Sequence, residues 1–211
     1  QDAVSGILGV VPEKYRVGIK NTLSYKGITL SALIDIKKGG QMWNGTKGAM
    51  YYFGTHKDTE GRYTDTKLFE GVYGYADDNN NVIYTDASGN DLPTGTNPVE
   101  NTLVTNLNED WYWWSGPGSG FTGPCEPFVE KTDWIRLKEV YISYVIPEKV
   151  LKNTFIKNLE FYFTGTNLWL KTPYTGVDPE TSLFGNSNAL GIDYFNMPGT
   201  KSYTLGLRLD F

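Results

Sequence analysis

Apolar and polar residues alternate along the last ten positions of the chain. The apolar positions of this segment are Tyr203, Leu205, Leu207, Leu209 and Phe211. The intervening positions are Thr204, Gly206, Arg208 and Asp210. Successive side chains of a strand point to opposite faces, so this pattern predicts a strand with one apolar face and one polar face. A strand of about ten residues with this pattern is typical of a transmembrane β-barrel.

Four earlier segments show the same period of two. The five predicted strands span about 15–25, 28–38, 133–146, 158–170 and 201–211. Lys26-Gly27 separates the first two and predicts a tight hairpin turn. In the third segment the alternation changes phase near Lys138-Glu139, which predicts a β-bulge, and Pro147 ends the segment.

Short and long connections alternate between these strands. Residues 26–27 and 147–157 form short links, whereas 39–132 and 171–200 form long ones. Outer-membrane barrels have short periplasmic turns and long extracellular loops. The order therefore predicts that both long connections are extracellular and that the carboxy terminus is periplasmic. Within 39–132 we expect further short strands around Gly71–Tyr75 and Val82–Thr85.

Five strands are too few to close a barrel, because the smallest single-chain outer-membrane barrels have about eight. An open sheet edge in lipid would leave backbone groups without hydrogen-bond partners. We therefore expect the missing strands to come from another chain or from a preceding portion. The chain begins at Gln1 without the pattern of a signal peptide, so we expect a processed product or the carboxy-terminal piece of a longer protein.

Composition excludes several other classes of protein. The net charge of -5 argues against a general nucleic-acid binder, which would show a basic surface. Cys125 and His56 are the single residues of their types, so we expect no disulfide framework, no metal site built on Cys or His, and no cofactor. No segment has the run of about 18 apolar residues that a membrane helix requires.

Four groups of motifs follow one another along the chain. They are Asn21-Thr22-Leu23-Ser24-Tyr25-Lys26-Gly27 with Leu33-Ile34-Asp35; Asp133-Trp134-Ile135-Arg136-Leu137-Lys138-Glu139-Val140 with Pro147; Thr164-Gly165-Thr166-Asn167-Leu168 with Asp178-Pro179-Glu180; and Gly191-Ile192-Asp193-Tyr194 with Gly206-Leu207-Arg208-Leu209-Asp210-Phe211. In this order they resemble the last strands of the SusC/RagA-type TonB-dependent transporters of Bacteroidetes. The resemblance covers nearly the whole chain except the stretch 45–130.

This resemblance implies an all-β fold, an antiparallel transmembrane barrel of about 22 strands that is filled by a plug. Residues 15–211 would be its carboxy-terminal sector of five or so strands, and residues 1–14 the remnant of a preceding extracellular loop. The implied function is TonB-dependent import of oligosaccharide, or in some members peptide, across the bacterial outer membrane. The implied partners are a SusD-like surface lipoprotein, TonB, the plug with the rest of the barrel, and membrane lipid. No chemistry on the cargo is implied, so we expect no enzyme.

The run Trp111, Tyr112, Trp113 and Trp114 lies in a Gly- and Pro-rich part of the first long connection. One interpretation is a contact surface for cargo or for the lipoprotein, because Trp and Tyr are frequent interface anchors. The other is a loop core that buries its own aromatic side chains. We favour a loop core or a protein interface over direct contact with cargo.

Other polar and aromatic residues have simpler interpretations. Asp178 and Glu180 could form a glycosidase pair, but Asp before Pro favours a turn, and we expect no catalysis here. By parity, several charged side chains point into the lumen, where we expect salt bridges in preference to cargo contacts. These are Lys20, Asp35, Lys37, Glu160, Arg208 and Asp210. The acidic runs 77–81 and 86–91 lack the closing Glu of an EF-hand, and we expect surface turns. Trp169, and less securely Trp43, would belong to an aromatic girdle at the membrane surface.

A second hypothesis is a soluble β-sandwich that serves as a carbohydrate-binding or adhesin module. It predicts that the apolar strand faces pack on one another instead of on lipid.

Overall fold

The computed structural model describes residues 6–113, 116–121, 123–185, 187 and 189–211. They fall into two compact units. The sheet unit consists of Val10–Trp43 and Glu130–Phe211, and the loop unit consists of residues 6–9 and Asn44–Val129. We describe each unit by itself.

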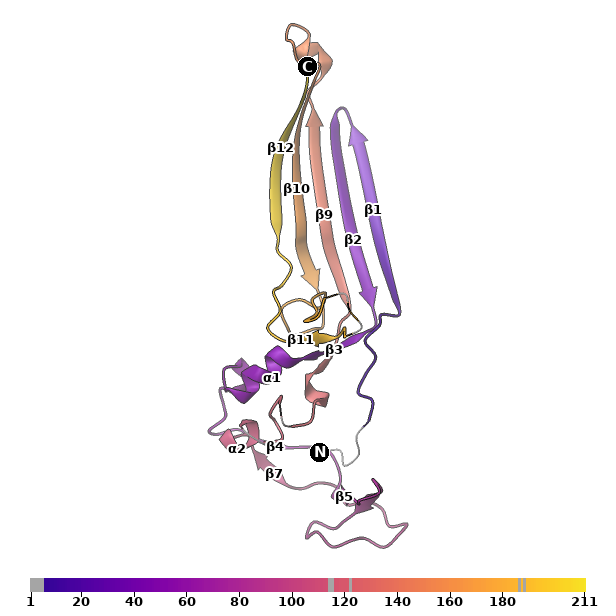
Figure 1. Cartoon of the computed structure of the whole chain (residues 1–211), viewed down its shortest axis with the longest axis vertical. Helices are drawn as coiled ribbons and strands as arrows, with labels where there is room; N and C mark the ends of the chain where they lie inside the picture. Colours follow the sequence, from indigo (N-terminus) through magenta and orange to yellow (C-terminus); the bar gives the residue numbers. More distant parts are fainter. Residues whose placement is uncertain (1–5, 114–115, 122, 186, 188) are drawn as a thin grey trace. The chain divides into compact units, whose positions relative to one another are not determined.

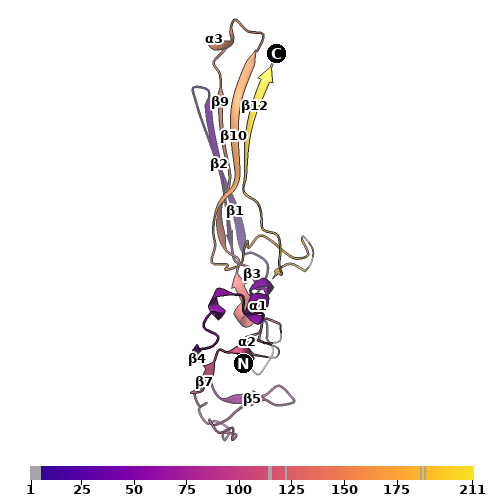
Figure 2. The ribbon, with the colours of Figure 1, turned by 90° about the vertical axis from the view of Figure 1, so that its left-hand side faces the viewer.

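A long antiparallel sheet of five strands dominates the sheet unit (Figure 1). Its strands, in spatial order, are β1 (Tyr15–Tyr25), β2 (Ile28–Lys38), β9 (Trp134–Val145), β10 (Asn158–Lys171) and β12 (Ser202–Asp210). Every strand pairs with its neighbours in antiparallel register. The one-turn helix α3 (Glu148–Leu151) joins β9 to β10 at the end where the chain terminates, as the view from the β12 edge also shows (Figure 2). This open antiparallel sheet has the topology predicted for a sector of a β-barrel wall.

The turn between β1 and β2 has two residues with positive φ. Lys26 has φ 48° and Gly27 has φ 83°, which is the backbone geometry of a type I′ turn. The carbonyl oxygen of Val145 would lie 2.8 Å from a Cβ at Gly27. Glycine is therefore required here both by the backbone conformation and by the neighbouring strand.

The predicted bulge in the third strand is confirmed. Leu33 pairs with Glu139 and Ile34 pairs with Leu137, so Lys138 is the extra residue of β9. The pairing of β10 with β9 shifts at the same level, between Thr166 and Trp169. This extra residue explains why the apolar parity changes within β9.

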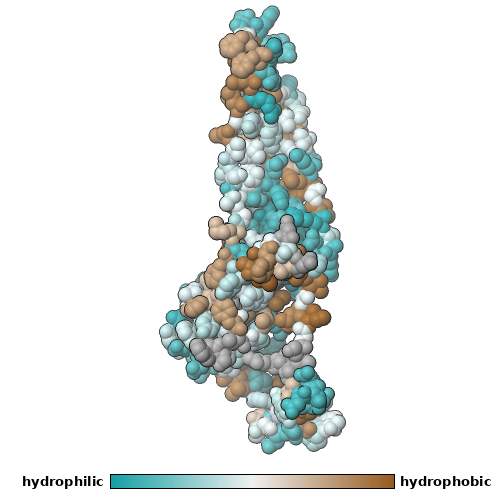
Figure 3. Space-filling model, in the orientation of Figure 1, coloured by the Kyte–Doolittle hydropathy of each residue, from teal (hydrophilic) through white to brown (hydrophobic). Residues whose placement is uncertain are grey.

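The two faces of the long sheet reverse the arrangement of a soluble protein. Leu205 on one face is 83% exposed, whereas Arg136 on the other is only 3% exposed. Figure 3 shows the second face, where white and teal polar groups predominate along the strands. Apolar side chains normally avoid water, so a wide exposed apolar face needs another covering. No described element of the sheet unit covers it.

A small core lies at the long-connection end of this unit. Gly39 and Gly40, both with positive φ, redirect the chain into β3 (Gln41–Asn44). This strand pairs between β8 (Val129–Lys131) and β11 (Ile192–Asp193). Trp43 stacks there on Tyr194 with ring centroids 6.4 Å apart. Trp43 therefore packs against the second long connection and does not take the girdle position that was expected less securely for it. Trp169, in contrast, is exposed on the apolar face.

Short elements make up the loop unit. They are α1 (Gly45–Tyr52), η1 (Lys57–Thr59), β4 (Thr66–Leu68), β5 (Gly74–Ala76), β6 (Val82–Tyr84), β7 (Val104–Asn106), α2 (Glu109–Tyr112) and η2 (Glu126–Phe128). The strand pair β5–β6 lies where further strands were expected. Asp77 and Asp86 each accept two backbone N–H groups within a tight turn, which confirms the surface-turn interpretation. Among the described helices, none combines the length and the apolarity needed to cross a membrane.

Candidate functional site

The polar face of the long sheet carries a charged network near its long-connection end. Trp134 lies at its centre, buried, and its indole Nε1 donates to the carboxylate of Asp35 at 3.0 Å. Arg16 donates to both oxygens of Asp35, at 2.9 and 2.8 Å. The Lys37 ammonium lies 4.6 Å from the centroid of the Trp134 ring, within cation–π range. Strands β1, β2 and β9 are thereby joined by side chains as well as by their backbone ladder.

Arg136 and Asp178 form a buried ion pair across this face. The guanidinium donates to both carboxylate oxygens, at 2.6 and 3.3 Å, and both side chains are almost fully buried. Asp178 also accepts from the backbone N–H of Glu180 at 2.9 Å. A bidentate pair of this kind fixes geometry strongly. It holds the connection 172–201 against the wall.

Glu180 extends the network toward solvent. Its carboxylate accepts from Arg16 at 2.9 Å and from Lys138 at 3.1 Å, and it lies 3.7 Å from Arg136. Asp178 and Glu180 therefore both form ion pairs with Arg or Lys side chains. The turn interpretation of Asp178-Pro179-Glu180 fits this arrangement, in which the backbone N–H of Thr181 donates to the carbonyl oxygen of Asp178 at 3.3 Å.

Most of the charged side chains expected in the lumen have polar partners on other strands of the sheet. Glu160 accepts from Arg208 at 2.6 Å and from Tyr141 at 2.9 Å. Lys20 lies 3.7 Å from Glu139, and Asp210 accepts from Asn158 at 3.1 Å. Glu160 and Lys20 thus lie against opposite charges on the polar face, whereas Asp210 is held by an uncharged amide.

The aromatic run of the loop unit is divided among different surroundings. Trp111 stacks on Phe69, with ring centroids 4.8 Å apart. Tyr112 is only 6% exposed and contacts Tyr51 edge to face, and its burial raises the pKa of its hydroxyl. Trp113 is 44% exposed. Trp114 lies outside the described residues.

Trp113 belongs to an exposed aromatic cluster with Tyr52, Phe53 and Phe121. Its ring stacks on Tyr52 at 5.1 Å with an interplanar angle of 20°. Phe53 and Phe121 meet the Tyr52 ring edge to face at 5.0 and 5.3 Å. The aromatic run in the sequence indicated Trp113. It did not indicate the partners Tyr52 and Phe53, at the end of α1, or Phe121. Trp113 is the most exposed of the described residues Trp111, Tyr112 and Trp113, so this cluster contains the solvent-facing part of the predicted contact site.

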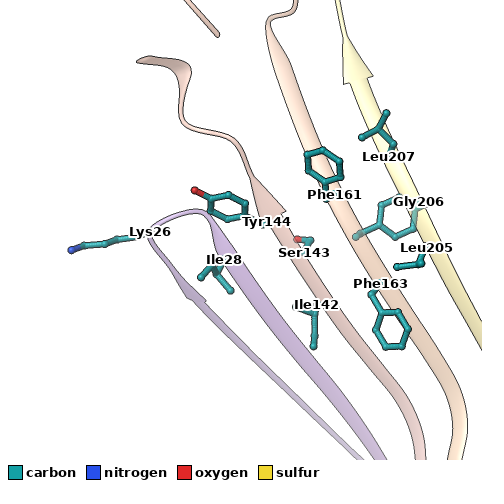
Figure 4. A pocket seen from close by; sticks show the side chains of 11 residues that line it. Lys26, Ile28, Ile142, Ser143, Tyr144, Phe161, Phe163, Leu205, Gly206 and Leu207 are labelled. Atoms are coloured by element: carbon teal, nitrogen blue, oxygen red, sulfur yellow. The ribbon is translucent and has the colours of Figure 1, made fainter. Parts of the chain in front are cut away.

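A wide concave surface lies on the apolar face of the long sheet (Figure 4). Side chains from β2, β9, β10 and β12 line it, among them Ile28, Ile142, Phe163 and Leu205. It is a wide, open depression lined almost wholly by apolar groups, and Figure 4 shows them side by side across the strands. It lacks the convergent polar groups that orient a ligand. Lipid chains suit such a surface better than a specific small molecule.

Comparisons with known proteins agree with this geometry. No protein-family model matches the chain. TonB-dependent receptor P3 of Formosa agariphila is 23% identical over 210 residues, which is 97% of this chain and 17% of the receptor. TonB-dependent receptor P26 of the same organism is 28% identical over 198 residues, which is 92% of this chain and 16% of the receptor. The chain thus spans about a sixth of the length of these relatives.

Solved structures give the same answer for the fold. The RagAB peptide importer in its open-open state superimposes with a TM-score of 0.55 at 20% identity, over 95% of this chain and 17% of that one. Its closed-closed state gives a TM-score of 0.53 at 18% identity, over 93% and 17%. The resemblance to SusC/RagA-type TonB-dependent transporters is confirmed. The relatives carry the names of receptors and transporters, not of enzymes, and they support an outer-membrane location.

Proposed function

We propose that the chain forms part of the wall of a TonB-dependent importer that takes up a nutrient across the bacterial outer membrane. The observation that carries this proposal is the reversed sheet, with exposed apolar residues such as Leu205 on one face and buried charges such as Arg136 on the other. In a barrel the first face meets lipid and the second lines the lumen. The names of the relatives and the fold likeness support the same reading.

In this proposal residues 15–211 are a carboxy-terminal sector of the barrel. The connections 39–132 and 171–200 lie outside the cell, residues 1–14 belong to a preceding extracellular loop, and Phe211 lies on the periplasmic side. A SusD-like lipoprotein covers the mouth, and TonB acts through the plug, which this chain does not contain. The cargo is an oligosaccharide or a peptide.

The exposed aromatic cluster around Trp113 is the proposed contact surface for the lipoprotein or for cargo. Stacked rings at the surface of a loop provide large, rigid contact area. Trp111 and Tyr112 take part indirectly, because their packing positions the turn that presents Trp113.

Uptake by living cells tests the proposed function. A strain with the intact full-length transporter should deplete oligosaccharides or peptides from a mixed medium, and loss of its gene or of TonB should stop the depletion of the same compounds. Mass spectrometry of the medium identifies them. Unchanged depletion in both mutant strains would contradict the importer.

Substitution of the cluster tests the contact surface. Trp113→Ala should weaken lipoprotein co-purification or cargo depletion by about tenfold, the usual effect of removing an aromatic anchor. The matched control Trp111→Phe, which keeps a ring against Phe69, should change neither. Reduced co-purification identifies the lipoprotein as the partner, and reduced depletion alone identifies cargo. Normal behaviour of Trp113→Ala in both assays would remove the cluster from the proposal.

The soluble sandwich makes a different prediction. A sandwich would remain folded and monodisperse in plain buffer, whereas the full-length importer should require detergent or lipid. Monodisperse behaviour without detergent would favour the sandwich.

A further inference from the structure

The exposed aromatic cluster takes two of its four residues, Trp113 and Phe121, from a strongly acidic part of the chain. Residues 68–129 contain nine Asp or Glu residues and no Lys, Arg or His. Charges of a single sign over a stretch of this length create a negative potential around it. A ligand that reaches the cluster therefore meets a field that attracts cations and repels anions.

Two carboxylates of this stretch lie directly before Trp113. Glu109 and Asp110 form the first turn of α2, and both are exposed. The backbone N–H of Trp113 donates to the carbonyl oxygen of Glu109 at 2.8 Å, so these two residues are one helical turn apart. Side chains at this spacing lie on the same side of a helical turn. A cation on the Trp113 ring would therefore have the Glu109 carboxylate within reach.

Aromatic rings of the loop unit already hold cations of the same chain. Residues 44–129 contain four Lys or Arg residues, and three of them lie within cation–π distance of a ring. The pairs are Lys47 with Tyr51 at 5.9 Å, Arg62 with Tyr63 at 4.9 Å and Lys67 with Phe69 at 4.9 Å. Among the described residues, no Lys or Arg lies over the ring of Tyr52, Phe53 or Trp113. A cation of another molecule can therefore take this place on the cluster.

The cluster is small for a protein interface. Its three most exposed rings are between 43% and 59% exposed, whereas a stable protein interface uses about 20–30 residues on each side. Trp111 and Tyr112 add little contact area, because their rings pack against other rings of the loop unit. The solvent-facing part therefore suits a few side chains of a short peptide better than the surface of a folded protein. This differs from the preference for a protein interface that the aromatic run alone indicated.

We propose that the aromatic cluster binds cationic peptides, with an Arg or Lys side chain of the peptide on the ring of Trp113 and paired with the carboxylate of Glu109. The inference rests on the proposed function, because it names the class of cargo that the contact surface takes. It adds a charge preference, by which peptides with Arg or Lys are captured and acidic peptides are repelled. Arg suits this place best, because its flat guanidinium stacks on aromatic faces.

Binding of two matched peptides to the purified full-length transporter tests the charge preference. One synthetic hexapeptide carries two Arg residues, and the other carries citrulline, an uncharged isostere of Arg, at the same positions. Isothermal titration calorimetry in detergent at low salt gives both dissociation constants. The Arg peptide should bind at least about tenfold more tightly, and this advantage should shrink at about 0.5 M salt, because salt screens exposed charges.

Three variants locate the site. Trp113→Ala should weaken binding of the Arg peptide about tenfold, and Glu109→Gln should weaken it about threefold. The control Glu148→Gln makes the same change of charge at an exposed position in the short link between β9 and β10, and it should not alter binding. All three variants should keep the compact gel migration of the folded barrel.

Equal binding of the two peptides, or unchanged binding of the Arg peptide to both Trp113→Ala and Glu109→Gln, would overturn the cationic-peptide site and leave the importer intact. Loss of lipoprotein co-purification from these two variants, without a change in peptide binding, would assign the cluster to a basic protein surface and overturn the peptide assignment. A transporter that binds the Arg peptide through Trp113 but depletes no compound in a TonB-dependent manner would retain the site and contradict the importer.

Discussion

The Arg136–Asp178 pair is buried, and a buried ion pair is a poor source of net stability, because removing two charges from water offsets much of their attraction. Breaking such a pair is costly all the same, since the remaining charge keeps its burial and loses its partner. The pair therefore serves to fix where the connection 172–201 meets the wall. Glu180 adds weaker, more exposed contacts to Arg16 and Lys138.

Arg136→Ala should release this connection. The change leaves Asp178 buried without its cation, at a cost of about 3 kcal/mol. Limited proteolysis of the full-length transporter should then cut within 172–201 much faster than in the unaltered protein. The control Lys138→Ala removes one exposed ion pair and should cost less than about 1 kcal/mol. Equal cleavage rates for Arg136→Ala and the unaltered protein would show that the pair does not hold the connection.

Asp133 should make the chain's exit from β2 sensitive to acid. The ammonium of Lys38 donates to this carboxylate at 2.5 Å, and the backbone N–H of Gly39 donates to it at 2.6 Å. These two contacts hold the pKa of Asp133 below its usual value of 3.8. Because the pKa is lower in the folded state, the stabilisation is fully present above the pKa of the unfolded state. It is lost as the pH falls through the pKa of the folded state. Since Lys38 is largely exposed, the effect is small.

A thermal comparison of Asp133→Asn with the unaltered transporter checks this expectation. The variant should melt at a lower temperature at neutral pH, and the difference should vanish at a pH well below 3.8, where the native carboxylate is protonated. A difference that persists unchanged in acid would mean that the charge of Asp133 is not responsible.

The turn between β1 and β2 depends on one glycine. Gly27→Ala places a Cβ 2.8 Å from the carbonyl oxygen of Val145 at a φ of 83°, so it should destabilise the barrel by about 1–2 kcal/mol. The control Gly18→Ala meets nothing closer than 4.0 Å in β1 and should be tolerated. The thermal stability of both variants is measured as the temperature at which the folded barrel loses its compact migration on a gel. If the two variants behaved alike, the turn would not be the constraint described.

Strand periodicity predicted the long elements well, because each strand has one apolar and one polar face over its whole length. The change of phase at Lys138 even located the bulge. The loop unit could not be predicted in this way. Its helix α1 is short and begins at the cap Asn44, whose side chain accepts from the N–H of Lys47, and it lacks a regular apolar face. Short elements of this kind form because of tertiary packing, which local pattern does not report.

The candidate sites were predictable only in part. Parity placed Asp35 and Glu160 on the polar face, but their pairing with Arg16 and Arg208 depends on which strands become neighbours. Likewise the run from Trp111 to Trp113 reads as one aromatic surface. Because of the helical turn α2, Tyr112 lies in the core and Trp113 lies at the surface. The residue types alone do not predict this difference.

The sheet as a whole is incomplete as a membrane structure. Among the described strands, β1 and β12 each pair on one side only. Edges in lipid require partners, because unpaired backbone groups there cost several kcal/mol each. The chain also spans only 17% of a TonB-dependent receptor to which it is similar. The sheet therefore requires neighbouring strands on both edges, as a larger barrel would supply.

Arginine placed on adjacent residues of β12 tests the assignment of the two faces most directly. Thr204 and Leu205 are neighbours in the chain but lie on opposite faces. The measurement is the unfolding free energy of the full-length transporter in phospholipid vesicles, with Leu205→Arg and Thr204→Arg compared. The assignment of the two faces predicts a loss of about 2–4 kcal/mol for Leu205→Arg, the cost of a charge on the lipid face, and less than about 1 kcal/mol for Thr204→Arg in the lumen. Equal losses, or a larger loss for Thr204→Arg, would contradict it.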